Sequence, residues 1–219
     1  MHSDIAIPQN NEAEFAEIAS KLGIKKLYFL YEPNNFDEQK INRKLESIKE
    51  KFNLNFETGI IVKNTDPNKT NSKLTAAKSS DKDRFLIESK KVRVIYGFEE
   101  LGRKDYLHQR ASGLNHIMCE LARKNKVSIG FSYSSILNNE LNSPVIIGRM
   151  SQNIKLCRKY KVKTIIGSFA SNPFSLRAPH DVSSLFKIFG MDERNVKNSF
   201  SYTLWAENQK VLIEDIQWI

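Results

Sequence analysis

Short apolar segments and longer amphipathic segments alternate along most of this chain. The short segments lack the strict polar alternation of a half-exposed strand. Uninterrupted apolar runs of this kind are typical of parallel strands that are covered on both faces. The pattern therefore predicts seven strands, at residues 5–7, 26–31, 56–62, 74–77, 92–96, 127–131 and 162–168.

Helices are expected between nearly all of these strands. Apolar residues that recur every three or four positions predict helices at residues 11–22, 36–52, 81–89, 113–124, 143–160 and 178–189, with two short helices near Glu193 and Leu204. In helix 113–124, the expected core residues are Leu114, Ile117, Met118 and Leu121. Alternating strands and helices favour parallel pairing with right-handed crossovers. Both a (β/α) barrel and an open sheet fit this rhythm.

The segment 164–191 carries the clearest local signals. It opens with an apolar strand, and the small residues Gly167 and Ser168 follow where the chain must turn. After a loop rich in Ser, Asn and Pro, Pro179 predicts the first turn of a helix, where a missing N–H costs nothing. Asp181 places a negative charge near the positive end of the helix dipole, and Gly190 ends the helix.

Length and termini favour one domain. The 219 residues suffice for a large core, and we expect a single barrel domain over residues 1–219. Residues 1–20 include acidic side chains and no long apolar run, which is unlike a signal peptide. No segment approaches the ~20 apolar residues of a membrane span. We therefore expect a cytoplasmic protein without a membrane partner, whose Cys119 and Cys157 are buried and reduced.

The net charge of +9 is distributed unevenly. Residues 61–191 hold 23 Lys and Arg against 10 Asp and Glu, whereas both flanking regions hold slightly more acidic than basic residues. Such a local excess favours a polyanionic partner. Charge alone fits equally well a protein with an ordinary lysine-rich surface.

Two clusters of cationic side chains contribute to this excess. The first lies in or beside an irregular segment and its helix, and comprises Arg103, Lys104, Arg110, His116, Arg123 and Lys124. The second lies within fifteen residues that contain no acid, and comprises Arg149, Lys155, Arg158, Lys159, Lys161 and Lys163. An ordinary solvated helix usually mixes both signs. We therefore expect the cations of helix 143–160 on its solvent face, in contact with phosphates.

Catalytic signals are weak. The chain has four histidines, no two of which are close enough in sequence to form a metal-ligand pair, so we predict no metal site. The nucleophile elbow, the Walker phosphate loop and the dinucleotide fingerprint are all missing. Ser168 with His180 is a coincidence of sequence rather than a nucleophile–base pair, and we assign no catalytic residue.

Three blocks of the sequence resemble a known family. They are residues 165–168 with Arg177-Ala178-Pro179-His180-Asp181-Val182 and Phe189-Gly190-Met191; Ser112-Gly113-Leu114-Asn115-His116; and the basic helix at residues 150–161. In this order they resemble ribonuclease P protein component 3, the archaeal counterpart of the eukaryotic thirty-kilodalton subunit. The resemblance covers about half of the chain.

This resemblance implies an α/β fold, namely a TIM-barrel-like (β/α) barrel related to the polymerase-and-histidinol-phosphatase superfamily. It selects the barrel over the open sheet. Metal-dependent members of that superfamily carry His-x-His just after the first strand, whereas Pro8, Gln9 and Asn10 stand there in this chain. The resemblance therefore implies a barrel whose metal site is lost.

The implied function is that of an RNA-binding protein subunit of ribonuclease P, which assists the RNA-catalysed removal of the 5′ leader from precursor tRNA. The RNA subunit would supply the catalytic centre and its Mg²⁺, and this chain would hold no cofactor. Its partners would be the ribonuclease P RNA, precursor tRNA, ribonuclease P protein component 2 and other ribonuclease P proteins. The alternative is a metal-dependent phosphoesterase of the same barrel superfamily with a degenerate site. A generic nucleic-acid-binding or scaffolding barrel is a third possibility.

We expect Arg177 to lie near the functional end of such a barrel, because it follows a strand and precedes a helix N-terminus, which favours anions. Asp181 would then support Arg177 by holding its guanidinium, or would satisfy the helix end alone. The competing interpretation is a purely structural pair of residues i and i+4 that fixes the loop. The expected RNA-binding residues are Arg103, Lys104, Arg110, His116, Arg123, Lys124, Arg158, Lys159, Lys161 and Arg177.

Overall fold

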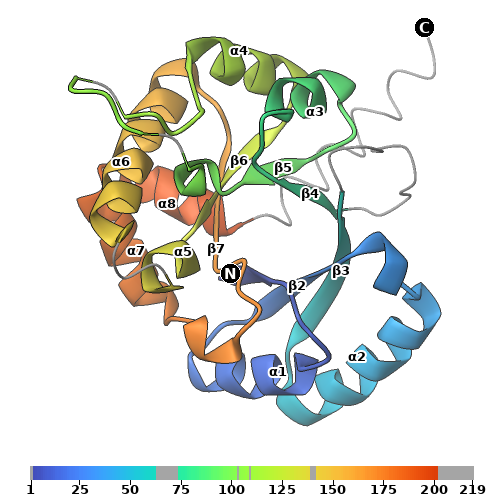
Figure 1. Cartoon of the computed structure of the whole chain (residues 1–219). Coiled ribbons are helices and arrows are strands. Elements are labelled where there is room, and N and C mark those ends of the chain that lie inside the picture. Colours follow the sequence, from blue (N-terminus) through green and yellow to red (C-terminus); the bar gives the residue numbers. More distant parts are fainter. Residues whose placement is uncertain (1, 63–73, 103, 109, 139–141, 202–219) are drawn as a thin grey trace, which may run out of the picture.

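All seven predicted strands form in the computed structural model, which describes residues 2–62, 74–102, 104–108, 110–138 and 142–201. They are β1 Ser3–Ala6, β2 Lys26–Tyr31, β3 Asn55–Ile61, β4 Leu74–Lys78, β5 Val94–Tyr96, β6 Ser128–Ser132 and β7 Thr164–Gly167. The strands pair in parallel and in chain order from β1 to β7. Helices surround them on the outside (Figure 1).

The ring of strands closes just beyond the end of β7. Phe169 has a positive φ of 49°, which kinks the chain there. Its N–H donates to the carbonyl of Ile5 at 2.7 Å, and the N–H of Ile7 donates to the carbonyl of Ala170 at 2.8 Å. A parallel bridge joins Ala6 and Ala170. The expected TIM-barrel-like fold is therefore confirmed as a nearly closed barrel of seven strands.

The eight α-helices of the described residues mostly match the predicted ones. They are α1 Glu12–Lys21, α2 Glu38–Phe52, α3 Asp83–Ser89, α4 His116–Asn125, α5 Ser134–Asn138, α6 Ser143–Tyr160, α7 Pro179–Ile188 and α8 Glu193–Phe200. The single-turn helices η1 Pro33–Asn35, η2 Phe98–Glu100 and η4 Pro173–Ser175 lie in loops. Helix α5 was not predicted, because its five residues are too few to show a helical period. The helix expected near Leu204 lies outside the described residues.

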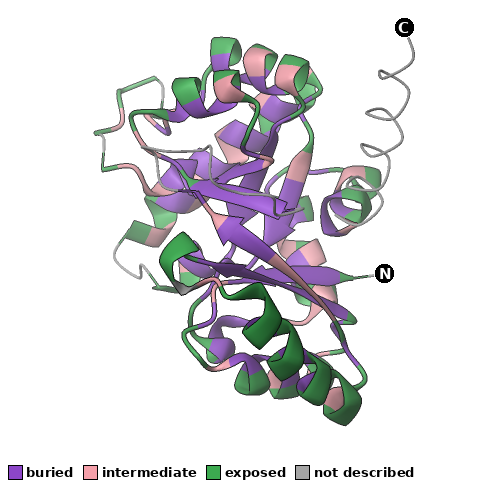
Figure 2. Ribbon diagram, turned by 90° about the vertical axis from the view of Figure 1, so that its right-hand side faces the viewer, coloured by how far each residue is buried: buried purple, intermediate pink, exposed green. Residues whose placement is uncertain are grey.

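The core has one inner and two outer layers. Inside the barrel pack nine apolar residues: Ile5, Tyr28, Leu30, Leu74, Ala76, Val94, Tyr96, Ile165 and Phe169. Tyr96 and Phe169 stack there with ring centroids 4.2 Å apart. Gly130 makes room for this stack, since a Cβ built on it would lie 2.9 Å from Cβ of Tyr96. One outer layer joins α1 and α2 to β1–β3, and a larger one lies under α3, α4, α6, α7 and α8. Figure 2 shows these helices buried toward the strands and exposed outward.

One core prediction for α4 was wrong. Ile117 is 47% exposed, whereas the buried residues are Met118, Cys119 and Ala122. Small Cys119 and Ala122 face inward because α4 packs against β6 and between α3 and α6. The prediction that Cys119 and Cys157 are buried is confirmed. Within the described residues, no helix is both long and apolar enough to cross a membrane.

Candidate nucleic-acid interface

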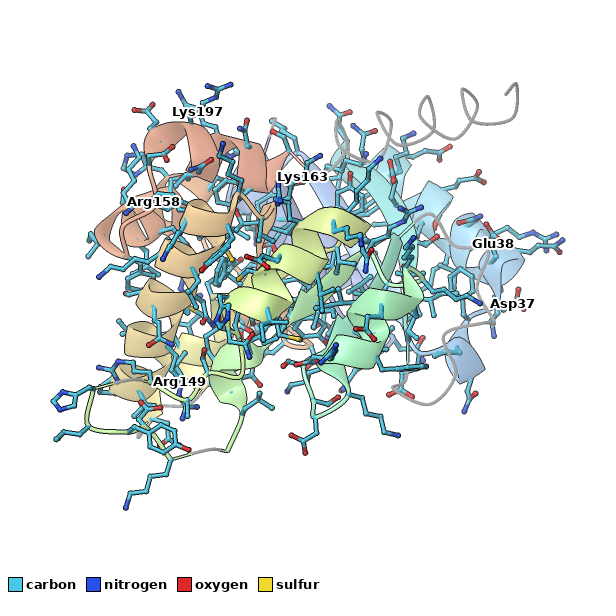
Figure 3. All side chains as sticks on the ribbon, turned by 90° about the horizontal axis from the view of Figure 1, so that it is seen from above. Asp37, Glu38, Arg149, Arg158, Lys163 and Lys197 are labelled. Carbon is cyan, nitrogen blue, oxygen red and sulfur yellow. The ribbon has the colours of Figure 1, made fainter. Side chains whose placement is uncertain are left out.

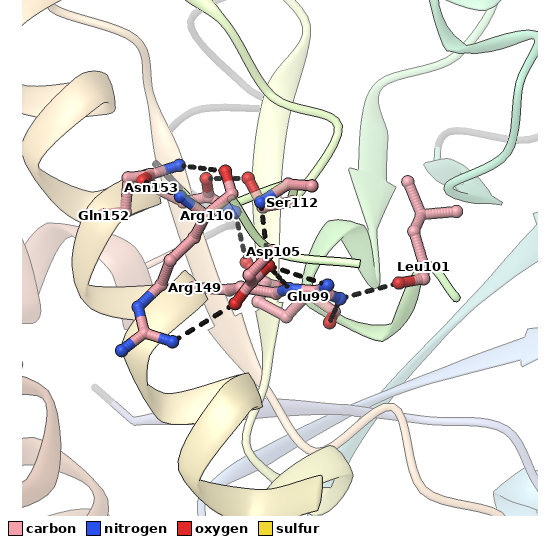
Figure 4. Close-up of polar contacts among 9 residues, drawn as sticks. Glu99, Leu101, Asp105, Arg110, Ser112, Arg149, Gln152 and Asn153 are labelled. Carbon is pink, nitrogen blue, oxygen red and sulfur yellow. Dashed lines mark hydrogen bonds and ion pairs between the residues drawn. The ribbon is translucent and has the colours of Figure 1, made fainter. Parts of the chain in front are cut away.

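The loop between β5 and α4 is fixed to α6 by a buried arginine (Figure 4). The Arg149 guanidinium donates to the carbonyl oxygens of Glu99 at 3.0 Å and Leu101 at 2.6 Å. It also pairs with the carboxylate of Asp105, at 2.9 Å from Nη2 to Oδ1 and 3.0 Å from Nε. Arg149 is only 4% exposed. Our expectation that it lies on the solvent face was therefore wrong.

The helical spacing of α6 already contained the signal for this burial. The buried face of the helix carries Ile146, Met150, Ile154 and Cys157, spaced three or four residues apart. Arg149 falls on the same face, one turn after Ile146. A charged residue on such a stripe needs a carboxylate or carbonyl partner, because an unpaired buried charge is very costly. Asp105 and the two carbonyl groups meet this need.

Arg110, an expected RNA-binding residue, belongs to the same network. Its Nη1 atom lies 3.2 Å from Oδ2 of Asp105, and its backbone exchanges two hydrogen bonds with the Gln152 side chain. The guanidinium lies over Gly148, where a Cβ would come within 2.3 Å of Cζ of Arg110. About half of the side chain remains exposed. Arg110 is thus held in one orientation while part of it can still meet a ligand.

Two carboxyl groups in this network have opposite environments. Burial acts against ionisation of Asp105, but hydrogen bonds from the Ala111 N–H and from Arg149 hold its pKa below its ordinary value. Burial raises the pKa of Glu99 to about 7, although Asn153 donates to its Oε1 at 2.9 Å. The other oxygen of Glu99 has no hydrogen-bond partner. Glu99 therefore keeps its proton up to about neutral pH, whereas Asp105 is ionised there.

The other expected residues of the first cluster lie apart from this network. Lys104 is exposed on the loop, and His116 is exposed at the first position of α4, where Asn115 caps the helix by accepting from the N–H of Met118 at 2.9 Å. Arg123 and Lys124 are exposed in the last turn of α4. Arg103 lies outside the described residues. The first cluster is therefore spread along α4 and its preceding loop.

The second cluster gathers at the end of α6. Lys155, Arg158 and Lys159 are exposed on this helix, and Lys161 and Lys163 are exposed between it and β7. Arg158 Nη1 donates to the carbonyl of Gly190 at 3.3 Å. Figure 3 shows Arg158 and Lys163 toward one end of the molecule and Arg149 toward the other end of α6. Apart from Arg149, the expected solvent exposure of these cations is confirmed.

Arg177 lies on the loop between η4 and α7, as expected, but it does not pair with Asp181. Its Nη1 donates to the carbonyl oxygens of Phe174 at 2.8 Å and Leu176 at 2.7 Å. The exposed carboxylate of Asp181 lies 3.6 Å from Nδ1 of His180 instead. Of the two roles expected for Asp181, the one that holds the Arg177 guanidinium was wrong, because the chain is still extended at Ala178 and the helix begins only at Pro179.

A buried polar cluster at the barrel seam holds the Arg177 loop. Oδ1 of Asp4 accepts the N–H groups of Ile5 and Ser168, each at 2.6 Å, and the Tyr133 hydroxyl donates to Oδ2. The Tyr133 oxygen also accepts the N–H of Arg177 at 3.4 Å. Burial raises the pKa of Asp4 to about 6 despite these hydrogen bonds. Sequence analysis missed this cluster, because its members lie more than 120 residues apart.

Among the described residues, no three His, Cys, Asp or Glu side chains lie close enough together to share a metal ion. The buried carboxyls of Asp4 and Glu99 are each engaged in the separate networks described above. The arrangement offers positive charge on a rigid barrel rather than a group of reactive side chains.

Comparisons with known proteins agree with this picture. The family model described as RNase P subunit p30 matches residues 1–206. The chain is 24% identical to ribonuclease P protein component 3 of Methanothermobacter thermautotrophicus over 84% of this chain and 78% of that protein. It is 23% identical to the protein of the same name from Methanococcus maripaludis, over 84% of each.

The barrel is also found in a solved structure. A chain in the cryo-EM structure of archaeal ribonuclease P with mature tRNA matches with a TM-score of 0.78. The match covers 93% of this chain and 89% of that chain at 18% identity, which shows the shared fold. The resemblance carried by the three sequence blocks is thus confirmed: the chain belongs to the RNase P subunit p30 family, whose members are protein subunits of ribonuclease P.

Proposed function

We propose that this chain binds RNA within ribonuclease P and thereby assists the RNA-catalysed removal of the 5′ leader from precursor tRNA. Family membership favours this function over a metal-dependent phosphoesterase of the same barrel superfamily. Its RNA partners would be the ribonuclease P RNA and precursor tRNA. We further propose ribonuclease P protein component 2 as a protein partner, and the cytoplasm as the place of action.

The observation that carries this proposal is the one-signed surface at the end of α6. Residues 149–163 contain six Lys and Arg and no Asp or Glu. Five of the six are exposed, and the sixth, Arg149, is the buried anchor at the opposite end of the helix. Surface cations usually alternate with acids that lower the local potential. A run without such acids suits the regularly spaced phosphates of RNA.

We propose that the chemistry of cleavage, including Mg²⁺, belongs to the RNA and that this chain supplies no catalytic group. The donor set supports this, since the described residues bring no three potential metal-ligating side chains together. The described cations of the expected site lie on loops and helix surfaces. Their role would be to hold and orient the RNA.

Reconstitution tests this function directly. Precursor tRNA cleavage is measured with the ribonuclease P RNA and its other proteins, with and without this chain, at limiting Mg²⁺. We expect the chain to increase cleavage severalfold and the isolated chain to cleave nothing, with or without Mg²⁺. Equal rates with and without the chain would contradict the proposal, and turnover by the isolated chain would favour the phosphoesterase alternative.

A further inference from the structure

A pocket of about 470 Å³ opens at the N-terminal ends of β6 and β7, beside the last turns of α6 and α8. This is the end of the barrel opposite to the loops that follow the strands. Apolar side chains line its inner part, namely Ile154, Cys157, Val162, Ile165 and Met191. Arg158, Lys161 and Lys163 line the same pocket, and the lining residues that the structure describes include no carboxylate. A volume of this size falls within the range of small-ligand sites.

A buried hydroxyl group in the lining lacks a partner. Ser128, the first residue of β6, is only 1% exposed, and its Oγ has no hydrogen-bond partner within the described part of the chain. Almost all buried polar groups in proteins are hydrogen-bonded, so such a group indicates a missing ligand or water. Asn195 and Asn198 of α8 add amide donors and acceptors to the same lining. The pocket therefore offers both charge and specific hydrogen-bonding groups.

The preference of helix C-termini for cations explains only part of the positive charge at this pocket. Cations are favoured at helix C-termini by the helix dipole, which accounts for Arg158 and for Lys161, the residue that ends α6. Lys163 stands instead at the entrance to β7. Burial lowers its pKa, and so does the like charge of Lys126 at the end of α4. Cations from the end of α6 and from the entrance to β7 thus line one pocket, where an anion could contact all three.

We infer that this pocket binds one unpaired nucleotide of an RNA partner, with the base on the apolar inner wall and a phosphate at Arg158, Lys161 and Lys163. The inference rests on the proposed function as an RNA-binding subunit. A base of a regular duplex is stacked between its neighbours and cannot enter a pocket, whereas bases of single-stranded loops and bulges can be turned out and bound. The hydroxyl and amide groups would contact the edge of the base.

The test measures binding of the full chain to a labelled single-stranded oligouridine and to a duplex hairpin RNA by fluorescence anisotropy. Asn198→Trp narrows the pocket without changing charge, and Asn34→Trp places the same side chain on an exposed loop outside the pocket. Lys163→Gln removes a lining charge, and Lys40→Gln removes an exposed charge on α2, outside both the pocket and the basic run of residues 149–163. We expect the pocket variants to bind the single strand about five- to tenfold more weakly, which is the usual effect of one lost base or phosphate contact. Their duplex affinity and the two controls should change by no more than about twofold.

Photocrosslinking of the wild-type chain to an oligouridine containing 4-thiouridine provides a readout that needs no variant. We expect crosslinks in residues 157–165 or 191–201. Crosslinks confined to other segments, or pocket variants that bind both RNAs as their controls do, would overturn the inference while leaving RNA binding intact. Absence of any RNA binding by the wild-type chain would instead overturn the proposed function and the inference together.

Discussion

The two ends of helix α6 carry arginines that have opposite roles. Near its start, Arg149 is buried and holds the β5–α4 loop through Asp105 and two carbonyl groups. Near its end, Arg158 is exposed and lies beside Lys161 and Lys163 at an open pocket. Figure 3 shows how far apart these arginines lie.

This difference shows that a cation is available to a ligand only where the fold leaves its side chain exposed. At the loop end of the barrel, several polar groups pair with one another. Asn153 donates a hydrogen bond to Glu99, and Lys78 forms an ion pair with Glu100. At the opposite end, lysines gather on one surface, and Lys126 lowers the pKa of Lys163. Internal ion pairing fixes a side chain in place, whereas exposed like charges on one surface favour a polyanionic partner.

The largest effect should come from removing the buried anchor. Arg149→Ala should lower the free energy of unfolding by about 3–5 kcal/mol, because the carbonyl groups of Glu99 and Leu101 lose their donor and Asp105 loses its buried cation. Urea denaturation followed by circular dichroism measures the change. Lys155→Ala, exposed on the same helix, should change it by less than about 0.5 kcal/mol. Similar losses in both variants would break the distinction between the two ends of α6.

The pH dependence of stability should expose the buried carboxyl of the loop end. The folded-state pKa of Glu99 is raised to about 7, above its ordinary value near 4.5. The folded protein therefore binds more protons than the unfolded chain between these values, and stability falls as pH rises through this window. Glu99→Gln should flatten the fall by on the order of 3 kcal/mol. Urea denaturation at several pH values measures this, with exposed Glu88→Gln as control. An unchanged slope would show that Glu99 is ionised in the folded state.

Displacing the Arg110 side chain should show whether its fixed orientation serves RNA binding, because the displacement should change stability little. A Cβ at Gly148 would collide with the end of the flexible Arg110 side chain. Gly148→Ala should therefore move that side chain while changing stability by no more than about 1 kcal/mol, since alanine favours helices. If the fixed orientation serves RNA binding, reconstituted cleavage should fall about fivefold, which corresponds to roughly 1 kcal/mol. Gly102→Ala, where a Cβ meets no atom within 4 Å, is the control. Full cleavage activity in Gly148→Ala would show that the orientation of Arg110 does not contribute to RNA binding.

The smallest effect on stability is expected at Arg177. Its guanidinium contacts only carbonyl groups of its own loop and is exposed. Arg177→Ala should therefore cost less than about 1 kcal/mol while lowering reconstituted cleavage. Because Arg177 and Asp181 do not touch, the effects of Arg177→Ala and Asp181→Ala on thermal stability should add. Strongly non-additive effects of the two substitutions would indicate that Arg177 and Asp181 do form an ion pair. Equal losses of stability and cleavage in Arg177→Ala would show that the role of Arg177 is structural.

Much of the fold could be predicted from local patterns. Residues 26–31 and 143–160 match the observed β2 and α6 to the residue, because uninterrupted apolar runs and a helical period are local properties. The same patterns failed where packing decides between neighbouring faces. Ile117 is exposed and Cys119 is buried, because the strands and helices around α4 select its small face. The sequence also did not show where α7 begins. Because the helix starts at Pro179, Arg177 and Asp181 do not lie on one helical face and do not pair.

By itself, the sequence determined the strand–helix order, the excess of positive charge and the motifs that place the chain in its family. Only the tertiary structure decided which cations are exposed. Arg149 and Arg158 look alike in a basic segment, but the partners of Arg149 come from residues 99–105, some fifty positions away. The pocket at the ends of β6 and β7 likewise combines residues from 128 to 201. Burial and ion pairing depend on which residues lie close together in space. For residues that are far apart in the sequence, the folded structure decides this, and local patterns do not show it.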